Sequence, residues 1–249
     1  MNISVVVLTC NQKALTLRCL RSLASFIEAP GCELILVDNG STDGTADAVR
    51  AEFPLVRLIV QDKNIGISRG RNAGLQRCTG EYLMILDNDT VADKETVFGL
   101  ADYLRRNPEV GIVAPRLVSP GGETQRSFKS FPGIGVKIKN VLSGKKRTSV
   151  ADNVPEYELE PFYIIGAAQM FTRDVYEMAG PLDEKIFYGP EDADFCMAVR
   201  KIWKRVVYCP QFTIVHDWQR ATTKKLFSAT GRRHLQGLLY FYAKHLRLF

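Results

Sequence analysis

The first half of the chain alternates short apolar runs with amphipathic segments. The apolar runs predict buried strands at Ile3–Leu8, Leu34–Val37, Leu58–Val60 and Tyr82–Leu86. Apolar residues recur at helical spacing between and after these runs, which predicts helices over residues 14–27, 45–53, 67–78 and 94–106. Because strands and helices alternate, we predict an α/β fold with a doubly wound, mostly parallel sheet.

The second half is less regular. Short apolar runs predict strands at Gly111–Ala114, Phe162–Phe171, Val206–Tyr208 and Thr213–Val215, and helices are predicted near Asp174–Ala179 and over Glu191–Trp203. The stretch from Phe131 to Val154 combines Gly, Pro and basic residues, and we interpret it as a mobile loop or an insertion. Without a repeat or a low-complexity linker, one compact domain followed by a tail is preferred.

The composition is that of an ordinary globular protein. The chain has 249 residues, of which 46% are hydrophobic and 24% charged, enough to bury a full core. Its six cysteines form no CxxC pair, which favours reduced thiols in a cytosolic protein. The first ten residues lack the basic start of a signal peptide, and no apolar run approaches the ~20 residues that span a bilayer.

Positive charge is concentrated in the tail, residues 218–249. This tail carries seven basic residues and no acidic one, which more than accounts for the net charge of +6. A second basic stretch runs from Lys129 to Arg147. Such charge indicates a solvated basic face or an anionic partner, either a membrane surface or a phosphorylated substrate. Leucines recur at helical spacing in the tail, so it either packs on the core or lies on a membrane as a basic amphipathic helix.

Three polar residues, Asp87, Asn88 and Asp89, follow directly after the predicted strand Tyr82–Leu86. At the carboxyl end of a strand in an open α/β sheet they would face the usual ligand crevice. Two carboxylates one residue apart suit Mg²⁺ or Mn²⁺, which in turn can hold a phosphate. The alternative is a simple turn, where Asp and Asn are common.

Polar residues follow the other predicted strands as well. Thr9 and Asn11 come after the first strand and Asp38 after the second, so all of them would lie along the same edge of the sheet as Asp87. A carboxylate at Asp38 can accept a hydrogen bond from the N3–H of uracil or thymine, or from a ribose hydroxyl. Thr9 and Asn11 can bond the same base, or they can belong to a turn.

The segment Asn64–Gly74 opens a predicted helix with three glycines and two arginines. A helix amino terminus with close backbone approach at Gly66 and guanidinium donors from Arg69 and Arg71 is suited to a diphosphate. Glycine spacing alone is weak evidence for a phosphate-binding loop. The segment also differs from a dinucleotide-binding loop, because it does not follow the first strand.

Acidic residues and one histidine in the second half are further candidates. Glu191 and Asp192 lie in the first turn of a predicted helix, where acidic side chains interact favourably with the helix dipole. Alternatively, one of them is a general base that deprotonates an incoming hydroxyl. His216 ends a predicted strand, and it either is structural or completes a metal shell with the Asp87–Asp89 pair.

In this order, the motifs resemble those of family-2 glycosyltransferases of the GT-A fold, and rhamnosyltransferase-like bacterial members look closest. The motifs are Thr9–Asn11, Val37–Thr45, Asn64–Gly74, Leu86–Asp89, Glu191-Asp192 and His216. The resemblance spans Ile3 to about Leu246. It implies a GT-A domain at 1–217, with a Rossmann-like nucleotide-sugar-binding half at 1–110 and an irregular acceptor and catalytic half at 111–217. The basic amphipathic tail at 218–249 would follow.

The resemblance also implies roles for these residues. Asp38 would bind the base, Asp87 the ribose or the metal, and Asp89 the metal and the diphosphate. Asp192 would be the catalytic base, with Glu191 as the alternative, and His216 a metal ligand or a diphosphate contact. The remaining expected donor-binding residues are Thr9, Asn11, Asn64, Gly66, Arg69, Arg71, Asn72 and Asn88. The loop after Asn64 departs from the pattern, because many such members carry an aromatic residue there.

The expected activity is an inverting transfer that depends on Mn²⁺ or Mg²⁺. The sugar would move from a UDP- or dTDP-sugar to a hydroxyl of a glycan or a lipid-linked acceptor, in cell-surface polysaccharide synthesis. We expect a cytoplasmic protein without a nucleic-acid partner, in peripheral contact with the inner face of the membrane through its tail.

Two alternatives stay open at this point. In a haloacid-dehalogenase-type phosphatase, the sequence Leu83–Val91 would be the first motif and Asp87 the nucleophile. That assignment leaves Asp38 and the Asn64–Gly74 segment without a role. The other alternative is a nucleotide-sugar binder without catalysis.

Overall fold

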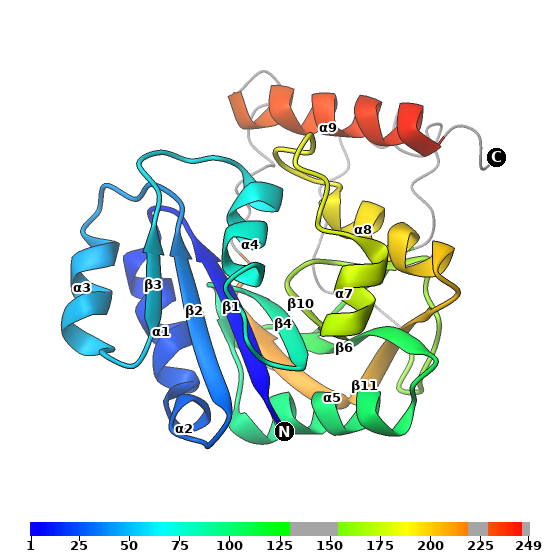
Figure 1. The fold of residues 1–249 in the computed structure, drawn as a ribbon, viewed down its shortest axis with the longest axis horizontal. Helices are drawn as coiled ribbons and strands as arrows, with labels where there is room; N and C mark the ends of the chain where they lie inside the picture. The colour runs from blue at the N-terminus through cyan, green and yellow to red at the C-terminus, as the bar shows by residue number, and fades with distance from the viewer. Residues whose placement is uncertain (130–153, 219–228, 246–249) are drawn as a thin grey trace.

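The computed structural model describes residues 1–129, 154–218 and 229–245. In this part of the chain, a large sheet runs through the molecule and helices cover both of its faces (Figure 1). The predicted α/β fold with a doubly wound sheet is confirmed. Most of the predicted loop at 131–154 lies outside the described residues.

The first half forms four parallel strands in the spatial order β3-β2-β1-β4. These strands are β1 (Ile3–Thr9), β2 (Cys32–Asp38), β3 (Arg57–Val60) and β4 (Tyr82–Asp87). The helices are α1 (Lys13–Ser22), α2 (Ala24–Ile27), α3 (Thr45–Glu52), α4 (Ile67–Leu75) and α5 (Lys94–Arg106). The single helix predicted over 14–27 is wrong, because Leu23, with φ −96° and ψ 7°, separates α1 from α2.

The second half continues the sheet in the order β4-β10-β6-β11-β5, and β7 pairs with β6. Its strands are β5 (Thr90–Val91), β6 (Val110–Val118), β7 (Thr124–Gln125), β10 (Ala168–Thr172) and β11 (Arg205–His216). A separate two-stranded sheet pairs β8 (Phe128–Lys129) with β9 (Tyr163–Ile164). The helices are α7 (Arg173–Ala179), α8 (Glu191–Lys201) and α9 (Ala229–His245).

Two predicted boundaries in this half are wrong. The strand predicted at Phe162–Phe171 is two strands, β9 and β10, which belong to different sheets. The two strands predicted at Val206–Tyr208 and Thr213–Val215 are one strand, β11, because a register shift between Cys209 and Thr213 absorbs the polar interruption without ending the pairing with β6.

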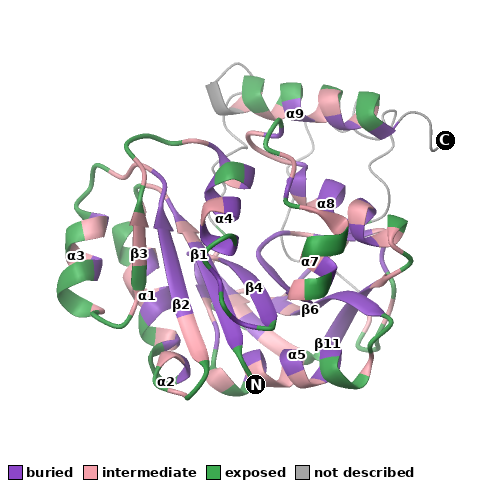
Figure 2. Ribbon diagram, in the orientation of Figure 1, coloured by how far each residue is buried: buried purple, intermediate pink, exposed green. Residues whose placement is uncertain are grey.

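Alternate residues of the central strands face two different apolar cores. Val5 and Val7 of β1 pack in the core that contains α1 and α5, whereas Val6 packs in the core on the side of α4 and α8. Central strands are therefore buried on both faces, as Figure 2 shows, which explains why their sequences are continuous apolar runs. Among the described residues, no helix is long and apolar enough to cross a membrane.

Candidate active site

Parallel pairing brings the ends of three strands to one edge of the sheet. Thr9 is the register partner of Asp38, and Leu8 is the partner of Asp87. The polar residues that follow β1, β2 and β4 therefore lie along one edge, as the strand-end argument predicts. The amino ends of α4 and α8 and the end of β11 reach the same region through the contacts described below.

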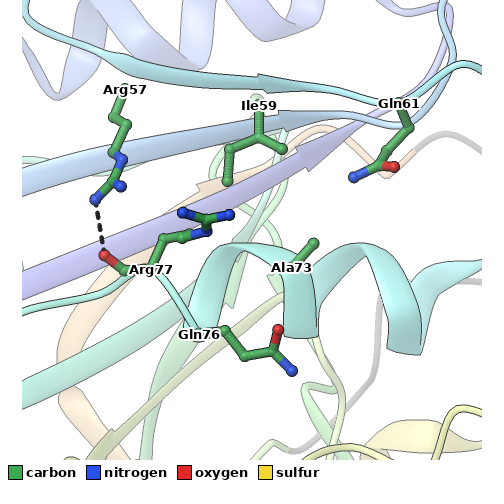
Figure 3. A pocket seen from close by; sticks show the side chains of 6 residues that line it. All are labelled: Arg57, Ile59, Gln61, Ala73, Gln76 and Arg77. Atoms are coloured by element: carbon green, nitrogen blue, oxygen red, sulfur yellow. Dashed lines mark hydrogen bonds between the residues drawn. The ribbon is translucent and has the colours of Figure 1, made fainter.

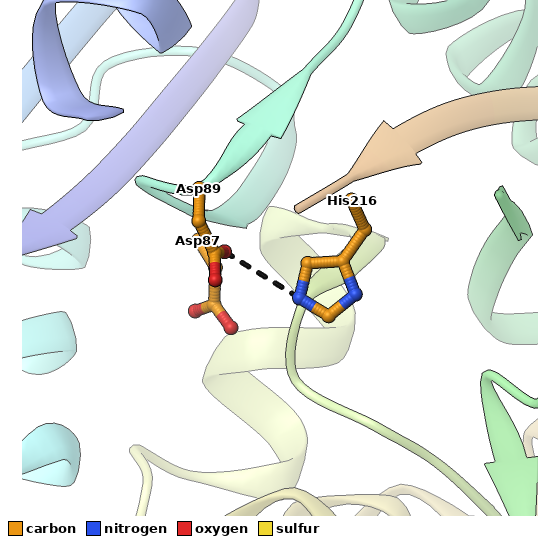
Figure 4. Close-up of side chains that lie close together, drawn as sticks. All are labelled: Asp87, Asp89 and His216. Carbon is orange, nitrogen blue, oxygen red and sulfur yellow. Dashed lines mark ion pairs between the residues drawn. The ribbon is translucent and has the colours of Figure 1, made fainter. Parts of the chain in front are cut away.

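Asp87, Asp89 and His216 form a cluster at this edge (Figure 4). Each offers a ligand atom, and these atoms lie within 4.8 Å of one another. His216 reaches the pair because β11 is antiparallel to β5, where His216 is the register partner of Thr90. Its Nε2 lies 3.4 Å from the Asp89 Oδ1. Two carboxylates and an imidazole are a donor set that fits a divalent cation such as Mn²⁺.

Gln125 holds His216 in one orientation and one tautomer. The Gln125 side-chain amide donates to the His216 backbone carbonyl at 2.8 Å, and its Oε1 lies 2.8 Å from His216 Nδ1. Since an amide oxygen only accepts, Nδ1 carries the proton and donates it, which leaves Nε2 to face Asp89. Burial lowers the pKa of His216, but Asp89 and Asp87 outweigh burial and raise it above the ordinary value. Gln125 belongs to none of the sequence motifs and could not be predicted as part of the site.

Arg71 is buried next to Asp87, with 3% of its surface exposed. Its guanidinium pairs with Asp87 Oδ1 at 2.7 Å and with Glu191 Oε1 at 3.2 Å, and it donates to the Gly166 carbonyl at 2.7 Å. Burial raises the pKa of Asp87, with Asp89 adding to the rise, while Arg71 opposes it. One buried cation thus links α4, β4, the loop before β10 and α8.

Glu191 and Asp192 occupy different environments at the start of α8. Glu191 is 6% exposed and pairs with Arg71, and burial raises the pKa of its carboxyl. Asp192 is half-buried, and its Oδ1 accepts a hydrogen bond from the Ala193 amide at 2.7 Å. Of the two, the structure leaves Asp192 more accessible to a substrate and places Glu191 in the protein interior.

Asp38 presents an unsatisfied carboxylate oxygen at the end of β2. Its Oδ1 accepts from the Ser41 amide at 2.8 Å, whereas its buried Oδ2 has no hydrogen-bond partner in the described part of the chain. A buried carboxylate oxygen without a donor is unfavourable in the free protein, so this oxygen favours a ligand that supplies one. The contact of Asp38 with a base or a ribose stays a prediction.

The structure places other predicted donor residues in a supporting network. Asn88 donates to the Thr9 and Thr16 hydroxyls at 3.1 Å, which ties the loop after β4 to β1 and α1. The Asn11 Oδ1 accepts from the Thr42 amide at 2.7 Å and so joins the loops after β1 and β2. Thr16, which accepts a hydrogen bond from Asn88 in this network, belongs to none of the sequence motifs.

The segment before α4 is fixed by its own contacts. Asn64 Oδ1 accepts from the Gly66 amide at 2.9 Å. Gly66 has φ +94°, and a Cβ at this position would lie 2.8 Å from the Phe187 carbonyl oxygen, so only glycine permits this approach. Arg69 is exposed and pairs with Glu184 at 3.4 Å, and the buried Asn72 amide donates to the Leu182 carbonyl at 2.9 Å. These contacts do not include Asp87, Asp89 or His216, and donor contacts by Arg69 and Asn72 stay predictions.

A concavity lies between the edge strand β3 and α4 (Figure 3). It is lined by Arg57, Ile59, Gln61, Ala73, Gln76 and Arg77. It includes neither a carboxylate nor any of the candidate catalytic residues, and we assign the chemistry to the cluster at the sheet edge.

A protein-family model described as glycosyl transferase family 2 matches residues 4–177. The chain belongs to glycosyltransferase family 2. The match covers β1 to α7 and therefore includes Asp38, Arg71 and the Asp87–Asp89 pair. This glycosyltransferase is an enzyme of the class that the sequence motifs indicate, and the phosphatase and non-catalytic alternatives are set aside.

Relatives of this glycosyltransferase include named rhamnosyltransferases. An N-acetylglucosaminyl-diphospho-decaprenol L-rhamnosyltransferase from Mycobacterium tuberculosis is 24% identical over 246 residues, covering 92% of this chain and 80% of the relative. The dTDP-rhamnosyl transferase RfbF from Shigella flexneri is 24% identical over 218 residues, covering 86% and 69%.

Two solved structures share the GT-A fold. The mannosyltransferase PcManGT from Pyrobaculum calidifontis, in complex with GDP-Man and Mn²⁺, has a TM-score of 0.67 and 22% identity, covering 99% of this chain and 64% of its own. GalNAc-T7 with UDP, GalNAc and Mn²⁺ has a TM-score of 0.65 and 14% identity, covering 98% and 51%. The chain thus spans about half to two thirds of these structures, and at these identities they show the fold alone.

Proposed function

We propose that this glycosyltransferase transfers a sugar, with inversion, from a UDP- or dTDP-sugar to a hydroxyl of a glycan or a lipid-linked acceptor. The observation that carries the proposal is the cluster of Asp87, Asp89 and His216 on the same sheet edge as the unsatisfied Asp38 carboxylate. A base-binding carboxylate and a cation site together fit a nucleoside diphosphate at its two ends.

Asp87, Asp89 and His216 would hold the cation, and Mn²⁺ is preferred because His216 adds a nitrogen ligand to the two carboxylates. The cation supplies charge stabilisation to the departing diphosphate. The carboxylate of Asp38 accepts a hydrogen bond from the base or the ribose. Arg71 balances the charge of Asp87 from the protein side and keeps its carboxylate in place.

Asp192 is the proposed general base. Its carboxylate takes the proton from the acceptor hydroxyl as the acceptor oxygen bonds to the anomeric carbon. The bond from that carbon to the diphosphate oxygen breaks on the opposite face, and its electron pair leaves with the diphosphate. This single displacement inverts the anomeric centre.

The named relatives favour particular substrate classes. One is named for a dTDP-rhamnosyl transfer and another for transfer to a diphospho-decaprenol-linked sugar. A dTDP-deoxyhexose is therefore the first donor to test, and a polyprenyl diphosphate-linked sugar the first acceptor, consistent with a role in cell-surface polysaccharide synthesis.

Calorimetric titration with UDP and dTDP, with and without Mn²⁺, tests the proposal. We expect nucleotide affinity to rise at least ~tenfold with Mn²⁺ and to lose this rise in Asp89→Asn, because a carboxylate ligand is removed. Asp47→Asn, an exposed acid on α3, is the control and should behave as the wild type. Binding of neither nucleotide, or binding that is indifferent to Mn²⁺, would contradict the proposal.

Gln125→Met should weaken Mn²⁺ binding by about 10–100-fold, because His216 loses the acceptor that sets its tautomer and ring orientation. Free Mn²⁺ is measured by electron paramagnetic resonance during a titration. Gln169→Met is the matched control, since Gln169 is also a buried glutamine but donates to the Ile164 carbonyl. If both variants bind Mn²⁺ equally well, Gln125 does not orient the ligand.

A further inference from the structure

Helix α9 is fixed to the protein through one of its faces. Gly237, Phe241 and His245 recur every four residues and are buried. His245 Nε2 lies 2.7 Å from Asp194 Oδ1, and Lys244 Nζ lies 2.8 Å from Asp194 Oδ2. A Cβ at Gly237 would lie 2.5 Å from the Gly189 carbonyl oxygen, so the helix backbone rests directly on the segment that leads into α8.

The opposite face of α9 is exposed and partly apolar. Arg232, Leu235, Gln236, Leu239 and Ala243 form this outer face, and Figure 2 shows exposed residues along the side of α9 away from α8. Leu235 is 54% exposed and Leu239 63%, one helical turn apart. A helix whose inner face is already packed ordinarily places polar residues there. Two exposed leucines one turn apart therefore indicate a contact that the described residues, 1–129, 154–218 and 229–245, do not make.

The charge of the tail sequence indicates which partner this face contacts. Residues 218–249 carry seven basic residues and no acidic one, and Arg232 lies on the outer face itself. Leucine beside basic residues is the pattern of a helix that lies on an anionic membrane. A second copy of the chain is disfavoured, because it would bring two positively charged tails together.

The outer face also has a favourable position relative to the active site. In Figure 1, α9 lies over α8, at the end of the molecule where β1, β2 and β4 terminate. Its inner face contacts Gly189, two residues before Glu191. A surface that touches α9 from outside is therefore brought close to the start of α8 and the proposed base.

We propose that the outer face of α9, made of Arg232, Leu235, Gln236, Leu239 and Ala243, docks on a membrane that contains anionic lipids. The leucines enter the interface, and Arg232 contacts the headgroups. Docking presents the start of α8 to an acceptor carried by the same membrane. The presentation of an acceptor to α8 rests on the proposed lipid-linked acceptor, whereas the docking itself does not.

Co-sedimentation with vesicles tests the docking. We expect the wild type to bind vesicles of equal parts phosphatidylcholine and phosphatidylglycerol, to bind phosphatidylcholine alone much less, and to be released by salt. The variant Leu235→Glu/Leu239→Glu should bind at least ~tenfold less, since two anions replace two apolar contacts. The control Leu55→Glu/Met178→Glu changes two other exposed apolar residues and should bind as the wild type.

Equal binding by the wild type and the α9 variant would overturn the docking proposal, as would equal binding to both kinds of vesicle. A wild-type dimer in analytical ultracentrifugation that becomes a monomer in the α9 variant would assign the face to a second copy instead. Mn²⁺-dependent nucleotide binding is expected unchanged in this variant. Failure of vesicle binding with intact nucleotide binding therefore removes only the docking proposal, and the converse result removes only the proposed function.

Discussion

Asp192→Asn is expected to lower kcat by about 10²–10⁴-fold, because the amide has no basic oxygen to take the acceptor proton. Donor affinity should stay within about threefold of the wild type, since the proposed donor contacts lie at Asp38 and the Asp87–His216 cluster. The half-buried position of Asp192, against the buried and ion-paired Glu191, is the reason for choosing it. Product-nucleotide release gives kcat, and calorimetry gives affinity.

The matched control for this variant is Asp174→Asn. Asp174 is an exposed acid in the first turn of α7, so its replacement removes a similar interaction with a helix dipole without touching the site. Its kcat should equal that of the wild type. An Asp192→Asn variant that loses donor affinity and turnover to the same extent would assign Asp192 to binding and not to proton transfer.

Local patterns predict the strand-end residues well. Apolar runs locate β1, β2, β3 and β4, and the carboxyl edge of a parallel sheet is a consequence of their order. Asp38 and Asp87 could therefore be placed together from the sequence, because nothing more than parallel pairing is needed. The position of His216 at the end of a strand could also be predicted from the local sequence. Its approach to Asp89, however, depends on the antiparallel pairing of β11 with β5.

Residues that act through distant partners could not be predicted in this way. Gln125 supports His216 from 91 positions away, and its short strand β7 has no periodicity to detect. Arg71 has the same sequence signal as Arg69, two guanidinium groups at the start of one helix, yet only Arg71 is buried. Arg69 and Arg71 lie on different faces of α4. Which of these faces is buried depends on the positions of β4 and α8, which the local sequence does not reveal.

The outer face of α9 illustrates the same limit. The leucine spacing in the tail left both core packing and membrane contact open, because both require an apolar stripe. The structure divides the stripe: Phe241 is buried against the core, while Leu235 and Leu239 face outward. Both interpretations of the tail can then hold for different faces of one helix, with membrane contact still a proposal.

Arg71→Met is expected to lower the free energy of unfolding by about 3–5 kcal/mol, because it leaves two carboxylates without their buried counter-ion. Arg71→Lys should fall between the wild type and Arg71→Met, since an ammonium keeps the charge but cannot reach Asp87, Glu191 and the Gly166 carbonyl in one plane. Urea unfolding gives the values. Arg69→Met, at an exposed position on the same helix, is the control and should change stability by no more than about 0.5 kcal/mol.

A second substitution distinguishes two causes of the expected stability loss, the uncompensated carboxylates and the missing side-chain volume. If the loss in Arg71→Met comes from uncompensated carboxylates, adding Glu191→Gln removes one of them, and the double variant should regain part of the lost stability. If the loss comes only from the missing volume of the guanidinium, Glu191→Gln will add its own destabilisation instead. Mn²⁺ offers an independent measure, because a cation bound by Asp87 in the native state should stabilise Arg71→Met by mass action. An Arg71→Met variant within about 1 kcal/mol of the wild type would mean that Asp87 and Glu191 do not depend on this cation.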